Sequence, residues 1–291
     1  MKSAQVLSEL NEQKGRSFQL VQKLAGSQGG SYEIAEGAGR AVMKWWPDPS
    51  RAERTRRAAS VIEAARAHGW PTPEWLLIGV LSTGWPYVVQ AFVEGKAIDR
   101  IGVREVEAVI AANDAQANVR VEGAFDWANA TESAVTGVTP WRDALQDFST
   151  AGRDLVTDCR DLIREAGAVD LPRRDIVHGD YSPANILWDP VDDGVVFVDA
   201  ETIGVGTRVI DLADLLRSAY VYGAAPDAKA LLTREAAAID GVQVLAWCAV
   251  GAVYGNMAWS IEHSPPNETA AKCDSLFPLI RMLRATLASD C

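Results

Sequence analysis

Residues that commonly bind metals or form disulfides are sparse in this chain of 291 residues, which has four cysteines and three histidines. The cysteines are scattered, and no two of them form a C-x-x-C pair. This spacing argues against a zinc site or a disulfide framework, so reduced thiols and a cytoplasmic location are expected. The first fifteen residues, MKSAQVLSELNEQKG, lack the apolar stretch of a secretory signal peptide, which favours the same location.

Basic residues are outnumbered, with 28 Lys and Arg against 39 Asp and Glu and a net charge of −11. This excess of negative charge argues against nucleic acid or an anionic membrane surface as the main partner. A cationic ligand fits the charge better. The 48% of hydrophobic residues can fill a sizeable core in one large domain or two ordinary ones.

One long segment, residues 242–260, carries no charge and raises the question of a membrane span. It contains Gly251 and Gly255, a spacing that lets helices pack closely. Gln243 and Asn256 interrupt its apolar character, and no cluster of lysine or arginine flanks it. We therefore expect a buried helix and no membrane partner.

The first third of the chain has a strand-like pattern of short apolar runs split by Gly, Pro or Ser. The five predicted strands are Phe18–Leu24, Ser31–Glu36, Arg40–Trp46, Trp75–Leu81 and Trp85–Gln90. A turn at residues 36–39 joins two of them, and one helix is expected from about Ser50 to Ala67. The pattern predicts a five-stranded, largely antiparallel sheet with one helix.

After Gly95 the pattern becomes helical, most clearly in residues 141–166, where apolar residues recur at steps of three and four. Further helices are expected after Asp211, Pro226, Gly241 and Asn267. Two apolar runs, residues 186–188 and 195–198, flank a polar turn and predict a hairpin packed on helices. The expected fold class is α+β, with a small antiparallel-sheet N-lobe (residues 1–95) and a large helical C-lobe (residues 96–291).

Polar residues gather in the stretch H-G-D-Y-S-P-A-N at residues 178–185 and at Asp199, which follows the hairpin. Phosphoryl transfer requires a carboxylate that orients or deprotonates the attacking hydroxyl, and oxygen ligands that hold Mg²⁺ on the phosphates. Asp180 suits the first role. Asn185 and Asp199 suit the second, because the hairpin folds the chain back. For H-G-D alone, a solvated loop is an equally good interpretation.

Residues 176–216 resemble the catalytic segment of aminoglycoside phosphotransferases, choline kinases and their protein-kinase-like relatives. The resemblance continues through V-D-A-E-T at residues 198–202 to a run beginning D-L-A. It implies a two-lobed, protein-kinase-like fold in which Asp180 is catalytic and Asn185 and Asp199 bind Mg²⁺. Asp211, which begins the D-L-A run, is then structural.

Two residues of this segment need separate comment. Ala200 stands where the family usually has Trp or Phe, which affects how the loop packs but removes no metal ligand. His178 is expected to buttress the catalytic loop, because the resemblance assigns it no chemical step.

The resemblance also implies a nucleotide site for ATP or GTP in the N-lobe. A glycine-rich turn would cradle the phosphates through backbone N–H groups, with Ser27, Gly29, Gly30 and Ser31 as its candidates. Lys44 would contact the α- and β-phosphates and pair with a carboxylate from the following helix, for which we choose Glu53 over Glu63. The C=O of Ala91 and the N–H of Val93 would hold the adenine.

Charge divides unevenly between the two lobes. Residues 1–95 contain 11 Lys and Arg against 9 Asp and Glu, whereas residues 96–291 contain 17 against 30. The resulting negative field of the C-lobe would concentrate a cationic acceptor near the catalytic carboxylate. Candidates to line the acceptor pocket are Glu201, Asp214, Glu262, Glu268 and Asp274. Each alone is also explained as a carboxylate that solubilises a helical surface.

The expected activity is transfer of the γ-phosphate of ATP or GTP, with Mg²⁺, to a hydroxyl of a small cationic molecule. An aminoglycoside or a basic peptide antibiotic is the favoured acceptor, in resistance or in biosynthesis. The alternative is a metabolic kinase for choline, a sugar, an amino alcohol or a ketosamine. A pseudokinase that only binds a nucleotide or a partner protein is the third hypothesis.

Overall fold

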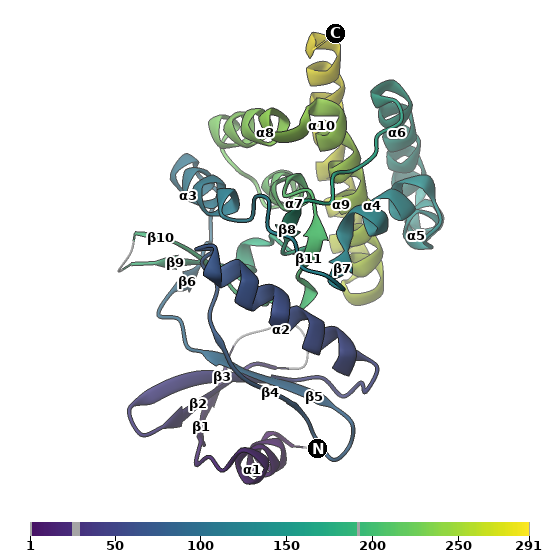
Figure 1. Ribbon diagram of the computed structural model, residues 1–291. Helices are drawn as coiled ribbons and strands as arrows, with labels where there is room; N and C mark the ends of the chain where they lie inside the picture. Colours follow the sequence, from purple (N-terminus) through teal and green to yellow (C-terminus); the bar gives the residue numbers. More distant parts are fainter. Residues whose placement is uncertain (1, 25–29, 191–192, 291) are drawn as a thin grey trace.

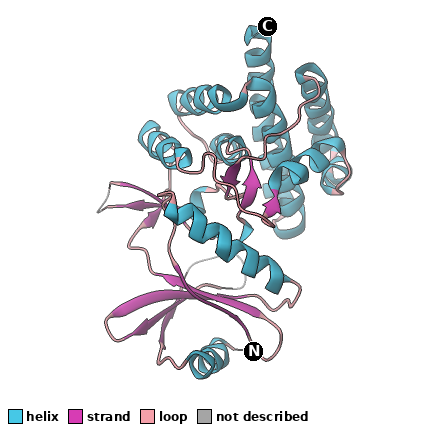
Figure 2. Cartoon of the chain, in the orientation of Figure 1, coloured by secondary structure: helices cyan, strands magenta, loops and turns pink. Residues whose placement is uncertain are grey.

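The computed structural model describes residues 2–24, 30–190 and 193–290. The chain forms two lobes, one built on a sheet and one built mainly of helices (Figures 1 and 2). This arrangement confirms the predicted α+β fold class.

The N-lobe sheet has five antiparallel strands in the order β1-β2-β3-β5-β4. The strands are β1 (Gln19–Lys23), β2 (Tyr32–Glu36), β3 (Gly39–Trp45), β4 (Trp75–Val80) and β5 (Pro86–Ala91). All five were predicted within two residues at each end, because short apolar runs split by Gly, Pro or Ser mark strand ends directly. Lys44 of β3 lies opposite Val88 of β5, in the middle of the sheet.

Two helices accompany the sheet. Helix α1 (Ser3–Lys14) was not predicted; it buries Val6, Leu7 and Leu10 in a small core with residues of the sheet. Helix α2 (Arg51–Ala67) was predicted and lies between the sheet and the C-lobe (Figure 1). Its apolar face belongs to the large core of the C-lobe, so α2 connects the two lobes.

Eight helices lie in the C-lobe of the described chain. They are α3 (Val103–Asp114), α4 (Trp127–Thr136), α5 (Trp141–Phe148), α6 (Thr150–Ala166), α7 (Val209–Val221), α8 (Pro226–Asp240), α9 (Val242–His263) and α10 (Pro266–Asp290). The last four confirm the predicted helices. The predicted stretch 141–166 is two helices, because Ser149 is extended and its hydroxyl accepts the N–H of Gly152 at 3.0 Å, capping α6.

Helix α9 is the central element of the C-lobe. It packs against α4, α5, α6, α7, α8 and α10. By length and composition α9 could span a membrane, but 67% of its apolar 18-residue stretch is buried inside the protein. Gly251 lets α9 pack closely against α4, since a Cβ at this position would lie 2.7 Å from Cγ2 of Thr131. The prediction of a buried helix is confirmed.

Two small sheets frame the loops between the lobes. One has the order β10-β9-β6 and contains the predicted hairpin; its strands are β6 (Lys96–Ala97), β9 (Ile186–Asp189) and β10 (Gly194–Phe197). The other was not predicted and has the order β7-β11-β8; its strands are β7 (Phe125–Asp126), β8 (Asp175–Val177) and β11 (Gly204–Gly206). Two short 3₁₀ turns, η1 (Pro183–Asn185) and η2 (Ala200–Thr202), complete these loops.

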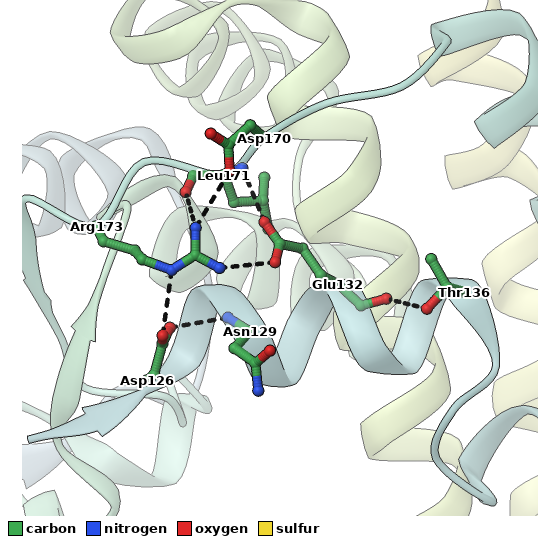
Figure 3. A network of polar contacts seen from close by, with 7 residues as sticks. All are labelled: Asp126, Asn129, Glu132, Thr136, Asp170, Leu171 and Arg173. Atoms are coloured by element: carbon green, nitrogen blue, oxygen red, sulfur yellow. Dashed lines mark hydrogen bonds and ion pairs between the residues drawn. The ribbon is translucent and has the colours of Figure 1, made fainter.

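Arg173 ties the segment before β8 to β7 and α4 (Figure 3). Its guanidinium donates to Asp126 at 3.1 Å, to Glu132 at 2.7 Å and to the backbone oxygen of Leu171 at 3.0 Å. The N–H of Leu171 in turn donates to Glu132 at 3.0 Å. Because β8 leads directly into the loop that carries the H-G-D motif, these contacts fix the start of that loop.

Candidate active site

A cavity of about 930 Å³ is lined by residues of both lobes. The predicted site residues that line it are Gly30, Ser31, Lys44, Val93, Asp180, Asn185, Asp199, Glu201 and Glu262. Thus Gly30 and Ser31, the strand lysine and the H-G-D segment face one space, although they are far apart in the sequence. Ser27 and Gly29 lie outside the described residues.

Asp211 anchors the start of the loop that carries the H-G-D motif. Its fully buried carboxylate accepts the N–H groups of His178 and Gly179, both at 2.8 Å, and the side-chain amide of Gln116 at 2.7 Å. Burial raises the pKa of Asp211 to about 7, while these donors favour the carboxylate. Its place at the start of α7 therefore supports the structural role expected for it.

His178 is completely buried beneath the same loop. Its ring lies among those of Trp70, Tyr181 and Phe197, with centroids 5.8, 5.6 and 6.3 Å away. Nε2 is 3.0 Å from the oxygen of Val198, and Nδ1 accepts the N–H of Asp180 at 3.1 Å. Burial lowers the pKa of His178 to about 4, so the ring is neutral and carries its proton on Nε2. This geometry supports the expected buttressing role.

Gly179 brings the catalytic loop against Trp127 of α4. Its φ is +83°, and a Cβ there would lie 2.0 Å from Cζ2 of Trp127. The indole N–H donates to the oxygen of Thr202 at 2.8 Å, and the Thr202 hydroxyl donates to the oxygen of His178 at 2.7 Å. Only glycine fits this position, because it needs both a left-handed backbone and an absent side chain.

Asp180 is a half-buried carboxylate with a raised pKa. Asn185 donates its side-chain amide to Oδ2 of Asp180 at 2.8 Å, which holds the carboxylate in place. Burial raises the pKa of Asp180 to about 6, and the charges of Asp214 and Asp199 add to the effect, whereas Arg217 opposes it. A carboxylate with this pKa is suited to accept a proton from a hydroxyl near neutral pH.

Asn185 and Asp199 both line the cavity with oxygen-bearing side chains. Because the amide nitrogen of Asn185 bonds to Asp180, its Oδ1 is the atom that can face a cation. Asp199 has a φ of +66°, a strained conformation that is common at functional sites. Among the described residues no group of three or more His, Cys, Asp or Glu forms a metal cage. The pair nevertheless fits Mg²⁺, which proteins often hold through one or two carboxylates together with phosphates and water.

Lys44 reaches the same cavity from the opposite lobe. Its ammonium forms an ion pair with Oδ1 of Asp199 and lies 3.9 Å from Oε2 of Glu201. Burial lowers the pKa of Lys44, but the charges of Glu201 and Asp199 outweigh it, so its pKa is raised overall. Lys44 is therefore a charged lysine that lines the cavity, where its ammonium could bind phosphates.

The predicted pair between Lys44 and Glu53 is wrong. Glu53 is exposed and binds Arg56 at 2.7 Å and Arg57 at 2.9 Å on the outer face of α2. The face of α2 that lines the cavity carries Arg51, Arg54 and Thr55. Helical spacing could have shown this, since positions 51, 54 and 55 lie one or two turns before the buried Ala58 and Ile62, whereas position 53 does not.

Among the residues that line the cavity are Gly30, Ser31 and Val93, which were predicted to bind the nucleotide. Gly30 has a φ of +90°, and a Cβ there would lie 3.0 Å from Cε2 of Tyr32, so the turn favours glycine. Ala91 ends β5 and is not among the lining residues; its own N–H donates to the backbone oxygen of Glu74 at 2.8 Å.

Of the five carboxylates predicted to bind the acceptor, only Glu201 and Glu262 line the cavity. Glu262 lines the cavity near the end of α9, beside Trp259 and His263, whose rings are stacked with centroids 4.8 Å apart. Asp214 is half-buried near Asp180 and pairs with the fully buried Arg217 at 2.8 Å. Glu268 and Asp274 are exposed on α10 and do not line the cavity. Glu201 lies beside Lys44, as described above.

The sequence alone did not single out Arg51, Arg54 or Trp259 as cavity residues. For the two arginines, the signal was available in the periodicity of α2. For Trp259 it was not, because a tryptophan in an apolar helix is indistinguishable from a core residue until the helix is packed.

Residues 21–248 match the model of the phosphotransferase enzyme family. The chain belongs to this family and is a small-molecule kinase. No curated protein matches it significantly in sequence.

Solved structures of aminoglycoside phosphotransferases have the same fold. A thermostable mutant of APH(4)-Ia in its apo form has a TM-score of 0.70 at 17% identity, covering 94% of this chain and 98% of that one. A putative aminoglycoside phosphotransferase from Ralstonia eutropha JMP134 has a TM-score of 0.69 at 14% identity, covering 99% and 98%. The aminoglycoside-3′-phosphotransferase of type VIII has a TM-score of 0.60 at 21% identity, covering 85% and 98%.

Proposed function

We propose that this kinase transfers the γ-phosphate of ATP or GTP to a hydroxyl of a small, cationic molecule such as an aminoglycoside or a basic peptide antibiotic. The observation that carries the proposal is the meeting of Lys44, Asp180, Asn185 and Asp199 on one cavity. These side chains supply a phosphate-binding cation, a proton acceptor and two metal ligands. That set is complete, which argues against the pseudokinase hypothesis.

Each residue has a separate task in the proposed reaction. Gly30, Ser31 and Lys44 bind the phosphates from the N-lobe, and we take residues 1–95 as the nucleotide-binding lobe. Asn185 and Asp199 would hold a Mg²⁺ ion, which would neutralise charge on the phosphates.

The C-lobe, residues 96–291, would bind the acceptor. Asp180 orients the acceptor hydroxyl and takes its proton as the oxygen attacks the γ-phosphorus. The bond from the γ-phosphorus to the bridging oxygen breaks, and the nucleoside diphosphate leaves.

Complexes of similar structures support a nucleotide and a small acceptor in this fold. APH(4)-Ia variants have been crystallised in ternary complexes with ADP and hygromycin B, and with AMP-PNP and hygromycin B. Their identities to this chain are 15% and 16%, so they support the class of ligand and leave the particular acceptor to experiment.

The preference for a cationic acceptor rests on charge near the proton acceptor. Glu262 lines the cavity, and Asp214 adds negative charge next to Asp180. The C-lobe as a whole carries 30 Asp and Glu against 17 Lys and Arg. Such a field attracts cations over a distance that shrinks with added salt.

An acceptor panel with a coupled ADP-release assay tests the function. The panel contains an aminoglycoside, a basic peptide antibiotic, choline, an amino alcohol and a neutral sugar, each with Mg²⁺-ATP and with Mg²⁺-GTP. We expect turnover with a cationic antibiotic that is abolished by Asp180→Ala. Turnover of choline or an amino alcohol only would favour the metabolic alternative, and no turnover with any nucleotide would contradict the proposal.

Salt dependence tests the charge argument for the chosen acceptor. Acceptor kcat/KM should fall severalfold between low and physiological ionic strength, because the attraction is screened within about 8 Å at physiological salt. Glu262→Gln should weaken this dependence, whereas Asp274→Asn, an exposed carboxylate outside the cavity, should leave it unchanged. A flat profile for the wild type would contradict the cationic acceptor.

A further inference from the structure

Helix α2 presents positive charge to the active-site cavity. Arg51 and Arg54 line it, whereas both glutamates of the helix face elsewhere. Glu53 is bound by arginines on the outer face, and Glu63 lines a separate groove between α2 and β4. The helix therefore provides no carboxylate for Lys44, although in protein kinases the corresponding strand lysine pairs with a glutamate of the following helix.

Glu201 lies beside Lys44, where neither glutamate of α2 is found. It belongs to η2, which packs against α2, and its Oε2 lies 3.9 Å from the Nζ of Lys44. The two side chains are 22% and 12% exposed, so water screens their interaction weakly. Burial raises the pKa of Glu201 to about 8, and the charge of Lys44 opposes that rise and favours the carboxylate. Electrostatically, Glu201 is also within range of Arg54.

The backbone that carries Glu201 is held on both sides. Ala200 is 3% exposed, and Thr202 donates its hydroxyl to the oxygen of His178 and accepts the indole N–H of Trp127. The contacts that hold the loop at His178 therefore also hold the backbone from which the Glu201 side chain extends toward Lys44.

Asp199, the other carboxylate paired with Lys44, is already assigned to the metal. The Asp199 side chain is 41% exposed and lines the cavity, whereas the Glu201 side chain is only 22% exposed. When Asp199 serves a metal, Lys44 keeps Glu201 as its carboxylate partner.

We propose that Glu201 is the positioning residue that holds Lys44 on the nucleotide phosphates, in place of a carboxylate from α2. Arg54, in the position where such a carboxylate would face the cavity, adds a second cation near the phosphates. This inference rests on the proposed function, because it requires a nucleotide in the cavity. It replaces the expectation that Glu201 binds the acceptor.

A double-mutant cycle on nucleotide binding tests the inference without an acceptor. Calorimetry would measure Mg²⁺-AMP-PNP binding to the wild type, Glu201→Gln, Lys44→Met and the double variant. We expect Glu201→Gln to weaken binding about fivefold where Lys44 is present, and not to weaken it where Lys44 is replaced. Glu201→Asp, which keeps the charge, should restore part of the loss.

Two controls separate this role from others. Glu53→Gln removes a carboxylate of the outer face of α2 and should leave binding unchanged. Repeating the titrations at tenfold higher Mg²⁺ tests Glu201 as a metal ligand, and thermal unfolding checks that each variant is folded.

Equal weakening by Glu201→Gln with and without Lys44 would overturn the inference, as would recovery of binding at high Mg²⁺. A Glu201→Gln variant that binds AMP-PNP like the wild type, but has a raised KM for the acceptor, would return Glu201 to the acceptor site and also overturn it. A wild-type protein that binds no Mg²⁺-AMP-PNP would contradict the proposed function and this inference with it.

Discussion

Gly179→Ala should be among the most damaging single-methyl changes in the protein. The residue precedes Asp180, has a φ of +83°, and its missing Cβ would lie 2.0 Å from Cζ2 and 2.3 Å from Cε2 of Trp127. Trp127 cannot move away freely, because its indole N–H donates to the oxygen of Thr202 at 2.8 Å.

The magnitude follows from three contributions. An alanine in the left-handed region costs about 1–2 kcal/mol. Forcing an atom into a packed site costs about 1–3 kcal/mol, and loss of the hydrogen bond from Trp127 costs about 1 kcal/mol. The sum is about 3–6 kcal/mol, which at about 2–4 °C per kcal/mol lowers the Tm by about 6–24 °C.

Gly223 offers a matched control. It follows α7 with a φ of +81°, and nothing lies within 4 Å of its missing Cβ. Gly223→Ala therefore carries only the backbone cost of about 1–2 kcal/mol. Thermal and urea unfolding of both variants would measure the difference, and the ADP-release assay would show whether Asp180 is displaced as well.

The expected difference between the two variants is about 2–4 kcal/mol, all of it from the contact with Trp127. Trp127→Ala in the Gly179→Ala background should recover turnover relative to Gly179→Ala alone if the clash displaces the loop. Equal destabilisation by the two glycine substitutions would refute the argument from close packing.

Three further predictions concern the site. Asp180→Ala should lose turnover and keep nucleotide binding, whereas Asp199→Ala should lose Mg²⁺-dependent binding; calorimetry that finds both equally unable to bind would contradict these roles. Lys44→Ala should raise the KM for ATP and lower kcat, and Lys96→Ala on exposed β6 should do neither; an unchanged kcat/KM for the Lys44 variant would make it an ordinary strand lysine. The pKa of His178 is about 4 when folded and about 6.5 when unfolded, so the unfolded chain binds the extra proton, and stability worth about 3 kcal/mol should be lost as pH falls from 6.5 to 4. Urea unfolding of the wild type and His178→Gln over this range should show their difference shrinking toward acid pH, and a constant difference would be inconsistent with a buried neutral ring.

The strands of the N-lobe and the last four helices could be predicted because each is a local pattern. Alternation, helical spacing and breakers act within a few residues, and the structure keeps them almost unchanged. Helix α1 and the β7-β11-β8 sheet were missed for the converse reason. α1 has only three buried residues, and strands of two or three residues have too few positions to form a pattern.

The candidate site divides in the same way. The sequence alone was enough to find Asp180, Asn185 and Asp199. The three residues lie close together in the chain, and the short β9–β10 hairpin that brings Asp199 back to the other two is itself a local pattern. It also placed Lys44 on a strand of the sheet.

Only the tertiary structure decided which carboxylate faces Lys44. Neighbouring residues of a helix point about 100° apart, so the apolar periodicity of α2 already separates Arg54 from Glu53, but it does not say which element contributes the carboxylate that Lys44 meets. The large apolar face of the helix, Ala58, Val61 and Ile62, is buried against the C-lobe core, and that burial turns the arginine inward. Glu201 is consequently the glutamate that pairs with Lys44.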